Sequence, residues 1–323
     1  MMHERVRVAV IGVGHLGEYH VQKYTALPEA ELVGVVDADA GRAEEISRRY
    51  GTMRYDDLGD LLGRVDAASL AVPTEHHHEV GRRILKAGVH VLIEKPITYD
   101  LAHADELIAL ADEAGLVLQV GHVERFNPAV VEMSGMLDRP IFIESHRMNL
   151  FTTRGTDVDV VLDLMIHDLD IILHMVPAEV REVHAVGLAV ITPQTDIANV
   201  RIIFDNGTVG NLTASRVSNN MLRKIRIFQP DAYISVNCAK REISRTELDR
   251  EQKGTDGFPQ IVTRKKSFPG SDPLADQIAS FVKAVRGGGA PVVSGRDGRR
   301  ALQVALAIID QIKEGCDHFK RIR

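Results

Sequence analysis

The sequence is poor in aromatic residues and cysteine. Among its 323 residues there is no tryptophan, aromatic residues make up 5%, and there are 2 cysteines, Cys238 and Cys316. Two cysteines cannot build a disulfide scaffold or a cysteine-rich metal site. Few rings are present on which nucleic-acid bases could stack. The net charge of −6 also argues against a general nucleic-acid binder.

Long hydrophobic runs are missing as well. No stretch of about 18 apolar residues is present, so we expect no segment to cross a membrane. A strand-like run begins at Val6, so we expect no signal peptide. With 45% hydrophobic and 26% charged residues, the composition is that of a globular protein of about two domains. We therefore predict a cytoplasmic protein.

Short β-branched runs alternate with amphipathic stretches in the first third of the chain. The mostly apolar runs are Val6–Ile11, Glu31–Val36, Ala67–Val72, Val89–Ile93 and Leu116–Val120. The helix-like stretches between them are His15–Leu27, Asp39–Tyr50, Asp57–Leu62, Glu75–Ala87 and Leu101–Ala114. Apolar strands separated by helices are typical of a doubly wound parallel sheet with both faces covered. We predict such an α/β domain over residues 1–121.

The pattern changes after Gly121. A helical link, a strand and an apolar helix are expected at Pro128–Leu137, Ile141–Leu150 and Val158–Met175. Strand-like runs then follow at Val180–Ile191, Ala198–Phe204, Thr208–Ser215, Lys224–Phe228, Tyr233–Asn237, Glu242–Leu248 and Gln260–Lys266. Asp205-Asn206-Gly207 is a strong hairpin signal. We predict a C-terminal α+β domain on a large open mixed sheet over residues 122–323, whose closing helices, Pro273–Arg286 and Arg296–Glu314, are able to pack back on the first domain.

A glycine-rich motif follows the first predicted strand. Residues 12–17 read Gly-Val-Gly-His-Leu-Gly, the G-x-G-x-x-G spacing of a dinucleotide-binding turn. In that turn Gly12 forms the tight bend and Gly14 lets the backbone approach a pyrophosphate. Gly17 lets the following helix pack closely on the strand. The position between a strand and a helix favours a cofactor site over a plain glycine turn.

An acidic residue ends the second predicted strand. Asp37 lies roughly 20 residues beyond the motif, where a carboxylate accepts both ribose hydroxyls of an adenosine and repels a 2′-phosphate. This position predicts NAD as the cofactor. Arg42 lies nearby and leaves NADP as the alternative.

A lysine after the fourth predicted strand is a candidate for chemistry. Glu94-Lys95-Pro96 follows the strand Val89–Ile93 and so lies at the carboxyl end of the sheet, where such folds bind ligands. Lys95 there can bind a substrate hydroxyl or exchange a proton with it. The alternative interpretation is a surface Glu-Lys pair.

The apolar helix Val158–Met175 carries an unusual number of ionisable groups. Asp163 and His167 are four residues apart and share one helix face, so the aspartate can orient the imidazole as a base. Asp168, Asp170 and His174 lie on the same helix. Because buried charges are costly, we expect this helix to line a cleft. A buried structural Asp–His pair is the alternative.

No metal site is predicted. His76, His77 and His78 are consecutive and diverge by about 100° each on a helix, so they cannot converge on one ion. His77 is able to approach the cofactor end of the sheet. The basic residues expected nearest a cleft are Arg125, Arg147, Arg154, Arg216, Arg223, Lys224 and Arg226. Some could neutralise an anionic substrate, and most are expected to be solvated charges on strands.

Taken together, these residues resemble the Gfo/Idh/MocA family of nicotinamide-dependent oxidoreductases over essentially the whole chain. The resemblance rests on an ordered set of motifs: the glycine motif, Pro73 to His77, Ala87-Gly88-Val89-His90-Val91, Glu94-Lys95-Pro96, Arg125-Phe126-Asn127-Pro128, Asp163-x-x-x-His167-Asp168 with Asp170, and Gly295-Arg-Asp-Gly298 with Ala301-Leu302. Residues 121–128 and 223–229 look most like the UDP-N-acetylglucosamine 3-dehydrogenase branch. Gln229-Pro230-Asp231-Ala232 departs from the glycine-containing turn of the wider family.

The resemblance implies an N-terminal Rossmann domain, a large open C-terminal sheet that makes a homodimer or homotetramer, and a catalytic group of Lys95, Asp163 and His167. It also implies a cofactor set of Gly12, Gly14, His15, Leu16, Gly17, Asp37, Pro73, His77, Glu94 and Lys95. The implied substrate set is Lys95, Arg125, Asn127, Arg154, Asp163 and His167.

The expected activity is NAD-dependent oxidation of a ring hydroxyl of a sugar or nucleotide sugar. The favoured reaction is oxidation at C3 of UDP-N-acetylglucosamine. An inositol or free-hexose dehydrogenase is the alternative within the family. A non-catalytic NAD(H)-sensing regulator is the alternative of another class.

Overall fold

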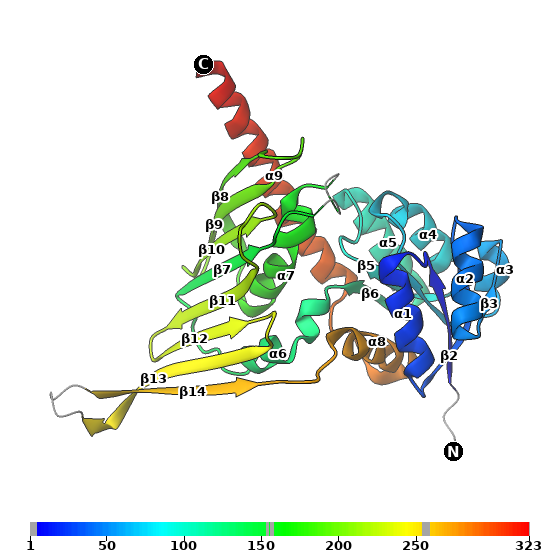
Figure 1. The fold of residues 1–323 in the computed structure, drawn as a ribbon, viewed down its shortest axis with the longest axis horizontal. Coiled ribbons are helices and arrows are strands. Elements are labelled where there is room, and N and C mark those ends of the chain that lie inside the picture. Colours follow the sequence, from blue (N-terminus) through cyan, green and yellow to red (C-terminus); the bar gives the residue numbers. More distant parts are fainter. Residues whose placement is uncertain (1–4, 153–154, 156–157, 254–258, 323) are drawn as a thin grey trace. The chain divides into compact units, whose positions relative to one another are not determined.

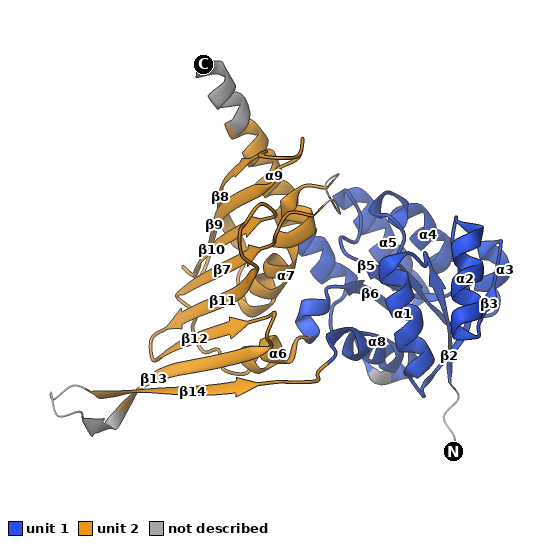
Figure 2. Ribbon diagram, in the orientation of Figure 1, with its two compact units in different colours: residues 1–126, 272–302 blue, residues 127–271, 303–323 orange. Residues whose placement is uncertain are grey.

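The protein folds into two compact units. The structure, a computed structural model, describes residues 5–152, 155, 158–253 and 259–322 (Figure 1). Unit 1 comprises residues 1–126 and 272–302, and unit 2 comprises residues 127–271 and 303–323 (Figure 2). The chain therefore leaves unit 1 at Phe126 rather than at 121. The short helix η2 (Val123–Phe126) stays in unit 1 because it packs against α8 (Pro273–Lys283), which the chain contributes much later.

Unit 1 is built on a parallel sheet. Its strands are β1 (Val6–Ile11), β2 (Ala30–Val36), β3 (Met53–Arg54), β4 (Ala67–Leu70), β5 (His90–Glu94) and β6 (Leu118–Gly121), in the order β3-β2-β1-β4-β5-β6. Every neighbouring pair is parallel. This strand order is that of a Rossmann fold, so the predicted fold class is confirmed. The two-residue β3 was not predicted because it is too short to leave a hydrophobic pattern.

Helices connect these strands. They are α1 (His15–Ala26), α2 (Ala40–Tyr50), α3 (Leu58–Leu62), η1 (Thr74–His76), α4 (His77–Lys86) and α5 (Leu101–Ala114), with η2, α8 and the π-helical η4 (Ala284–Gly288) beyond them. Aspartates cap three of the helices that connect the strands: the side chains of Asp39, Asp57 and Asp100 accept backbone N–H groups at the starts of α2, α3 and α5. Such caps satisfy donors that have no partner within the helix.

The core of unit 1 joins segments from both ends of the chain. Val8 and Val10 of β1 have no exposed surface, and neither has Phe281 of α8. The segment after α8 also adds to the sheet, because the Val120 N–H donates to the Val293 carbonyl at 3.0 Å. Helix α9 (Gly295–Ile322) begins in unit 1, and its residues from Gln303 onward belong to unit 2.

Unit 2 is built on a mixed sheet. Its strands are β7 (Phe142–Met148), β8 (Val180–Leu188), β9 (Ile197–Phe204), β10 (Val209–Ser215), β11 (Leu222–Gln229), β12 (Ala232–Asn237), β13 (Glu242–Lys253) and β14 (Pro259–Ser267), in the order β14-β13-β12-β11-β7-β10-β9-β8. Only β7 and β10 pair in parallel among these neighbours. The predicted Asn-Gly hairpin joins β9 to β10, with Gly207 at φ +85°.

One face of this sheet is covered by helices α6 (Pro128–Ser134), η3 (Val161–Met165), α7 (Ile166–Met175) and the later part of α9 (Figure 1). Ile202, Phe204 and Leu212 are at most 1% exposed. Because side chains alternate along a strand, these apolar residues take the buried positions and are not available to a partner subunit.

The opposite face of the unit 2 sheet is mixed in character. Phe142, Phe228 and Tyr233 form an aromatic row with ring centroids 5.5 and 5.0 Å apart. Beside it, Arg226 and Glu144 form an ion pair at 3.1 Å. This face therefore offers apolar rings and charges together.

Candidate active site

Each of the three glycines in the motif is suited to its position for a different structural reason. Gly12 has φ +81°, and a Cβ there would lie 2.8 Å from the Ala71 backbone. At Gly17 a Cβ would lie 1.8 Å from the Gly12 carbonyl oxygen, so only glycine lets α1 approach β1. At Gly14 no atom lies within 4 Å of the Cβ position. Gly14 is thus the glycine with open space before it, as a pyrophosphate site requires.

The first turn of α1 is exposed next to that space. Gly14 is the N-cap residue and provides no side-chain cap. His15 and Leu16 follow it and are exposed, Leu16 to 48%. Backbone N–H groups at such a helix start attract a phosphate. The motif, with the predicted contacts His15 and Leu16, therefore fits a dinucleotide.

Asp37 faces the glycine turn. Its Oδ2 accepts a hydrogen bond from the Val13 N–H at 2.6 Å, and its Oδ1 accepts one from the Asp39 N–H at 2.9 Å. A carboxylate oxygen has two lone pairs, so each oxygen can still accept a ribose hydroxyl.

Arg42, the residue that left NADP open, is engaged within unit 1. Its Nε donates to the Val13 carbonyl at 2.9 Å, Nη1 donates to Glu45 at 2.8 Å, and Nη2 donates to Glu18. The two carboxylates neutralise the guanidinium, so recruiting it to a 2′-phosphate would break these bonds.

His77 ties two loops together at the carboxyl end of the sheet. Its ring is 1% exposed, with Nδ1 2.9 Å from the Pro96 carbonyl oxygen and Nε2 3.0 Å from that of Val72. Burial lowers its pKa, although both carbonyls oppose that shift. His77 thereby links the segment before Pro73 to the one that follows Lys95.

The histidine triplet does not converge. His78 lies 2.7 Å from Glu106 and stacks on His103, while His76 lies 3.7 Å from Glu75. His77 is held by backbone carbonyls, so the three rings take three separate sets of partners. No group of three His, Cys, Asp or Glu residues able to hold a metal ion occurs within the described part of the chain.

Glu94 is held from two sides. Its Oε1 lies 3.0 Å from His20 Nε2 of α1, whose side chain is 1% exposed. The Lys95 N–H donates to Glu94 Oε2 at 3.4 Å. A Cβ at Gly121 would lie 2.6 Å from the same carboxylate. Glu94 therefore packs over the end of β6 and fixes the backbone at Lys95.

His122 is a residue that the sequence analysis did not single out. The parallel register pairs Glu94 with Gly121, so Lys95 and His122 each follow a member of that pair. His122 is 1% exposed. Burial first, and then the charges of Lys95 and Arg125, lower its pKa to about 3. His122 is therefore a neutral imidazole beside Lys95, and its place directly after a buried strand was the available signal.

Two predicted substrate residues make structural contacts. Arg125 is 6% exposed and donates from Nη2 to the Val292 carbonyl at 3.1 Å. Asn127 is 2% exposed, donates to the Cys238 carbonyl at 2.9 Å and caps α6. Both are buried and bound to backbone groups. Arg154 lies outside the described residues.

Asp163 and His167 stand out on their helical segment. Asp163 lies in the π-helix η3 and His167 in α7. Asp163 and His167 are partly exposed, whereas all the remaining residues from Val160 to Leu173 are buried. A π-turn widens the helix locally and often marks a functional site. The segment thus opens to solvent only at the two residues predicted to do chemistry.

The other ionisable groups of this helix do not line a cleft, contrary to expectation. Asp168 is 3% exposed and binds the buried Arg147 of β7, whose Nη2 lies 2.7 Å from Asp168 Oδ1. Asp170 is also buried, and His174 is exposed at the far end of α7. Arg147 was one of the basic residues expected near a cleft, either to bind an anionic substrate or as a solvated charge. It is buried instead because Asp168 neutralises its charge, which makes the burial tolerable.

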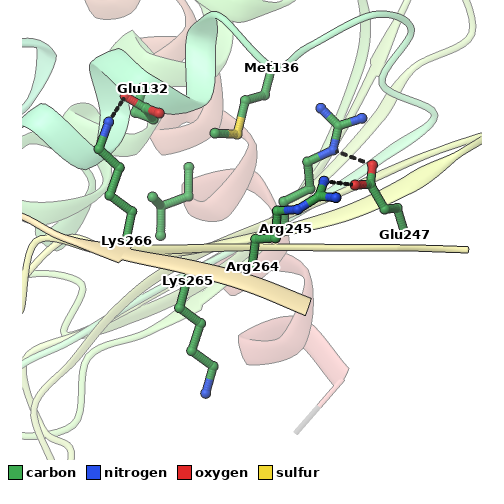
Figure 3. A pocket seen from close by; sticks show the side chains of 8 residues that line it. Glu132, Met136, Arg245, Glu247, Arg264, Lys265 and Lys266 are labelled. Carbon is green, nitrogen blue, oxygen red and sulfur yellow. Dashed lines mark hydrogen bonds and ion pairs between the residues drawn. The ribbon is translucent and has the colours of Figure 1, made fainter. Parts of the chain in front are cut away.

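A hollow of about 520 Å³ in unit 2 contains none of the predicted site residues. Its walls come from α6 and the following turn, from β13 and from β14 (Figure 3). Lys266 bonds Glu132 at 2.8 Å, and Arg245 and Arg264 bond Glu247. Four cations, Arg245, Arg264, Lys265 and Lys266, face only two carboxylates, Glu132 and Glu247, so the hollow is formally positive.

Comparison with known proteins decides the family. Residues 6–122 match the family described as oxidoreductase family, NAD-binding Rossmann fold, and residues 129–235 match the GFO/IDH/MocA C-terminal domain. The chain is 39% identical over 306 residues to a UDP-N-acetylglucosamine 3-dehydrogenase of Acidithiobacillus ferrooxidans, covering 94% of this chain and 96% of that one. The chain belongs to the Gfo/Idh/MocA family of oxidoreductases.

A second curated relative and a solved structure extend the comparison. A scyllo-inositol 2-dehydrogenase (NAD(+)) of Bacillus subtilis is 27% identical over 335 residues, covering 97% of this chain and 96% of the relative. A solved structure of the Acidithiobacillus ferrooxidans enzyme superposes with a TM-score of 0.89 at 37% identity, covering 96% of this chain and 98% of that one. The predicted family, fold class and dehydrogenase class are therefore confirmed. None of the helices in the described ranges has the length and hydropathy needed to span a bilayer.

Proposed function

We propose that this chain is an NAD-dependent dehydrogenase that oxidises the C3 hydroxyl of UDP-N-acetylglucosamine to the 3-keto sugar. The observation that carries the chemistry is the partial exposure of Asp163 and His167 on an otherwise buried helix. The choice of substrate draws support from the relative of that name, which aligns over 94% of the chain.

The proton in this reaction is handled by the chain's own residues. His167 accepts the proton of the ring hydroxyl, and Asp163 orients the imidazole and favours its charged form. Lys95 binds the reacting oxygen through its ammonium and shares the proton with it. NAD, when bound, supplies the hydride acceptor for the same carbon. The backbone at Lys95 is fixed in advance by Glu94, which His20 holds, and such preorganisation reduces the entropic cost of alignment.

The preference for NAD over NADP follows from two residues. Asp37 presents a carboxylate with free lone pairs beside the glycine turn. Arg42 is bound to Glu18 and Glu45, so it is a poor partner for a 2′-phosphate. The cofactor set proposed around them is Gly12, Gly14, His15, Leu16, Gly17, Asp37, Pro73, His77, Glu94 and Lys95.

We propose that the subunits assemble through the unit 2 sheet. The open face of the unit 2 sheet, with its aromatic row Phe142, Phe228 and Tyr233, is proposed to join subunits in a homodimer or homotetramer. A monomer in light scattering at micromolar concentration would refute this assembly.

The enzyme is proposed to act in the cytoplasm, as a nicotinamide-dependent enzyme of metabolism.

An inositol dehydrogenase is the second candidate, because scyllo-inositol is the substrate named for the Bacillus subtilis relative. Formation of NADH, followed by its absorbance, should be measured with UDP-sugars, free hexoses and inositols under identical conditions. We expect turnover with UDP-N-acetylglucosamine and at least tenfold less with inositols. Preference for an inositol would replace the proposed substrate. Binding of NAD without turnover of any compound, and with a response to the NAD/NADH ratio, would favour a regulator.

A further inference from the structure

Arg216, one of the basic residues expected near a cleft, is buried. It follows strand β10 directly and is 4% exposed. Its Nη1 donates to the Gly155 carbonyl at 2.7 Å, and its Nη2 donates to the Val158 carbonyl at 2.5 Å. One guanidinium thus holds two backbone carbonyls of the segment that leads into η3.

The charge of Arg216 is compensated inside unit 2. Its Nε lies 3.9 Å from Oδ1 of Asp196, which has no exposed surface. Asp196 accepts the backbone N–H groups of Val190, Ile191 and Thr192 at 2.8, 2.6 and 2.8 Å, and the Thr192 hydroxyl at 2.7 Å. Burial alone would raise the pKa of Asp196, but these hydrogen bonds lower it to about 2. Asp196 therefore stays ionised beside Arg216 at any working pH.

The segment that Arg216 holds contacts the candidate base pair. A Cβ at Gly155, where φ is +68°, would lie 3.3 Å from Asp163 Oδ2. The Asp163 N–H donates to the Asp159 carbonyl at 3.0 Å. The Val160 N–H donates to the Thr195 carbonyl at 3.0 Å, next to Asp196. The backbone before Asp163 is thereby held by Arg216 at Gly155 and Val158, and at Val160 by Thr195, the residue that precedes Asp196.

We propose that Arg216 is a positioning residue for the Asp163–His167 pair. The inference rests on the proposed function, in which Asp163 orients His167. By holding the Gly155 and Val158 carbonyls, Arg216 keeps the backbone of Gly155 against the Asp163 carboxylate and so limits the orientations that this carboxylate can take. Two carbonyls set at a fixed spacing suit the planar guanidinium, whereas a lysine ammonium is a single point charge.

The test compares Arg216→Lys with Arg139→Lys. Arg139 lies in the same unit with its side chain 78% exposed, so its replacement is the matched control. For Arg216→Lys we expect kcat to fall about 10- to 100-fold, the scale of a small misplacement of a catalytic group. The pH at which the rate rises should shift relative to the unmodified enzyme, because Asp163 no longer orients His167 uniformly. NAD affinity should be unchanged, since the glycine turn lies in unit 1.

A second measurement does not depend on activity. Hydrogen exchange at the amides of Val158, Val160 and Asp163 should accelerate at least tenfold in Arg216→Lys and stay normal in Arg139→Lys. Gly155→Ala, which keeps Arg216 but pushes a methyl group toward Asp163, should lower kcat and shift the pH profile in the same direction. Normal exchange and a normal pH profile in Arg216→Lys would overturn the positioning role. Absence of NADH formation by the unmodified enzyme with every UDP-sugar tested would instead refute the proposed function itself, so the two failures are distinguishable.

Discussion

Oδ2 of Asp37 accepts a hydrogen bond from the Val13 N–H at 2.6 Å. This bond places a carboxylate directly against the middle of the glycine turn. The residue that would select the cofactor is therefore also the residue that holds the turn in shape.

Asp37→Ala should weaken NAD binding about 10- to 100-fold, the scale of a lost charge-assisted hydrogen bond, and should weaken NADP binding much less. The reason is that the carboxylate accepts ribose hydroxyls and repels a 2′-phosphate. Calorimetric titration with both cofactors measures the ratio. Asp39→Ala is the matched control, because Asp39 caps α2 and its loss should lower stability by about 1 kcal/mol without altering cofactor choice. Equal losses for NAD and NADP in Asp37→Ala would exclude Asp37 as the discriminating residue.

His167→Asn should lower kcat about 10²- to 10⁴-fold, the usual contribution of a general base. The rise of rate with pH through the ordinary histidine range, about 6.5, should disappear in this variant. Asp163→Asn should cost less and move the rise to lower pH, since a neutral amide no longer favours imidazolium. NAD affinity should stay normal in both variants.

Lys95→Ala should also impair turnover but keep the rise of rate with pH, because Lys95 is assigned to align the substrate oxygen. Stopped-flow rates over a range of pH compare this variant with His167→Asn. If the rise survives in His167→Asn and vanishes in Lys95→Ala, the two roles are reversed.

The glycine motif offers a contrast between two substitutions of the same kind. Gly17→Ala places a methyl group 1.8 Å from the Gly12 carbonyl oxygen, so α1 must move away from β1, and thermal stability should fall by several degrees. Gly14→Ala meets no atom within 4 Å, so the fold should tolerate it. NAD affinity should nevertheless fall at least tenfold in Gly14→Ala, since the methyl group takes space needed by the pyrophosphate. Normal NAD binding by Gly14→Ala would contradict the proposed cofactor position.

His122 should make the protein less stable in mild acid. Burial, followed by the charges of Lys95 and Arg125, lowers its pKa to about 3 in the folded state, against about 6.5 when unfolded. Between these values the unfolded chain binds the extra proton, so the free energy of unfolding falls as pH decreases, by up to about 1.4 kcal/mol per pH unit. His77 and His90, whose pKa values burial also lowers, act in the same direction.

Urea unfolding of the wild type and of His122→Gln at about pH 7 and about pH 5 measures how much His122 contributes to the loss of stability in acid. The variant should lose less stability between the two conditions. Asp196 does not contribute in this window, because its pKa is lowered to about 2, and the stability it provides is lost only below about pH 4. An identical pH dependence in the variant would mean that His122 does not carry the effect.

Local patterns predicted much of the fold. The first strand was predicted at Val6–Ile11 and α5 at Leu101–Ala114, and the structure has both at these bounds. Such elements are set by apolar periodicity and by residues such as Asp100 that cap a helix. The π-helix at Val161–Met165 was not predicted, because its wider turn depends on packing against the sheet and leaves no periodic signal.

The groups that buried arginines bind could not be predicted in the same way. Arg147 and Asp168 are 21 residues apart and bury each other's charge. Arg216 is 61 residues from the Gly155 carbonyl that it binds. Whether an arginine is solvated or buried depends on which distant group the topology brings beside it. The catalytic candidates were accessible to sequence reasoning because glycine spacing and an ionisable pair on an apolar helix are local features.

The packing of Glu94 over Gly121 links two motifs that are far apart in the sequence. A Cβ at position 121 would lie between 2.6 and 2.8 Å from three atoms of the Glu94 carboxyl group. A side chain at 121 would therefore push the Glu94 carboxyl group out of its present place, where it meets His20 and the Lys95 N–H. An engineer who alters residue 121 alone would thus also disturb the backbone at Lys95, which is 26 residues earlier in the sequence.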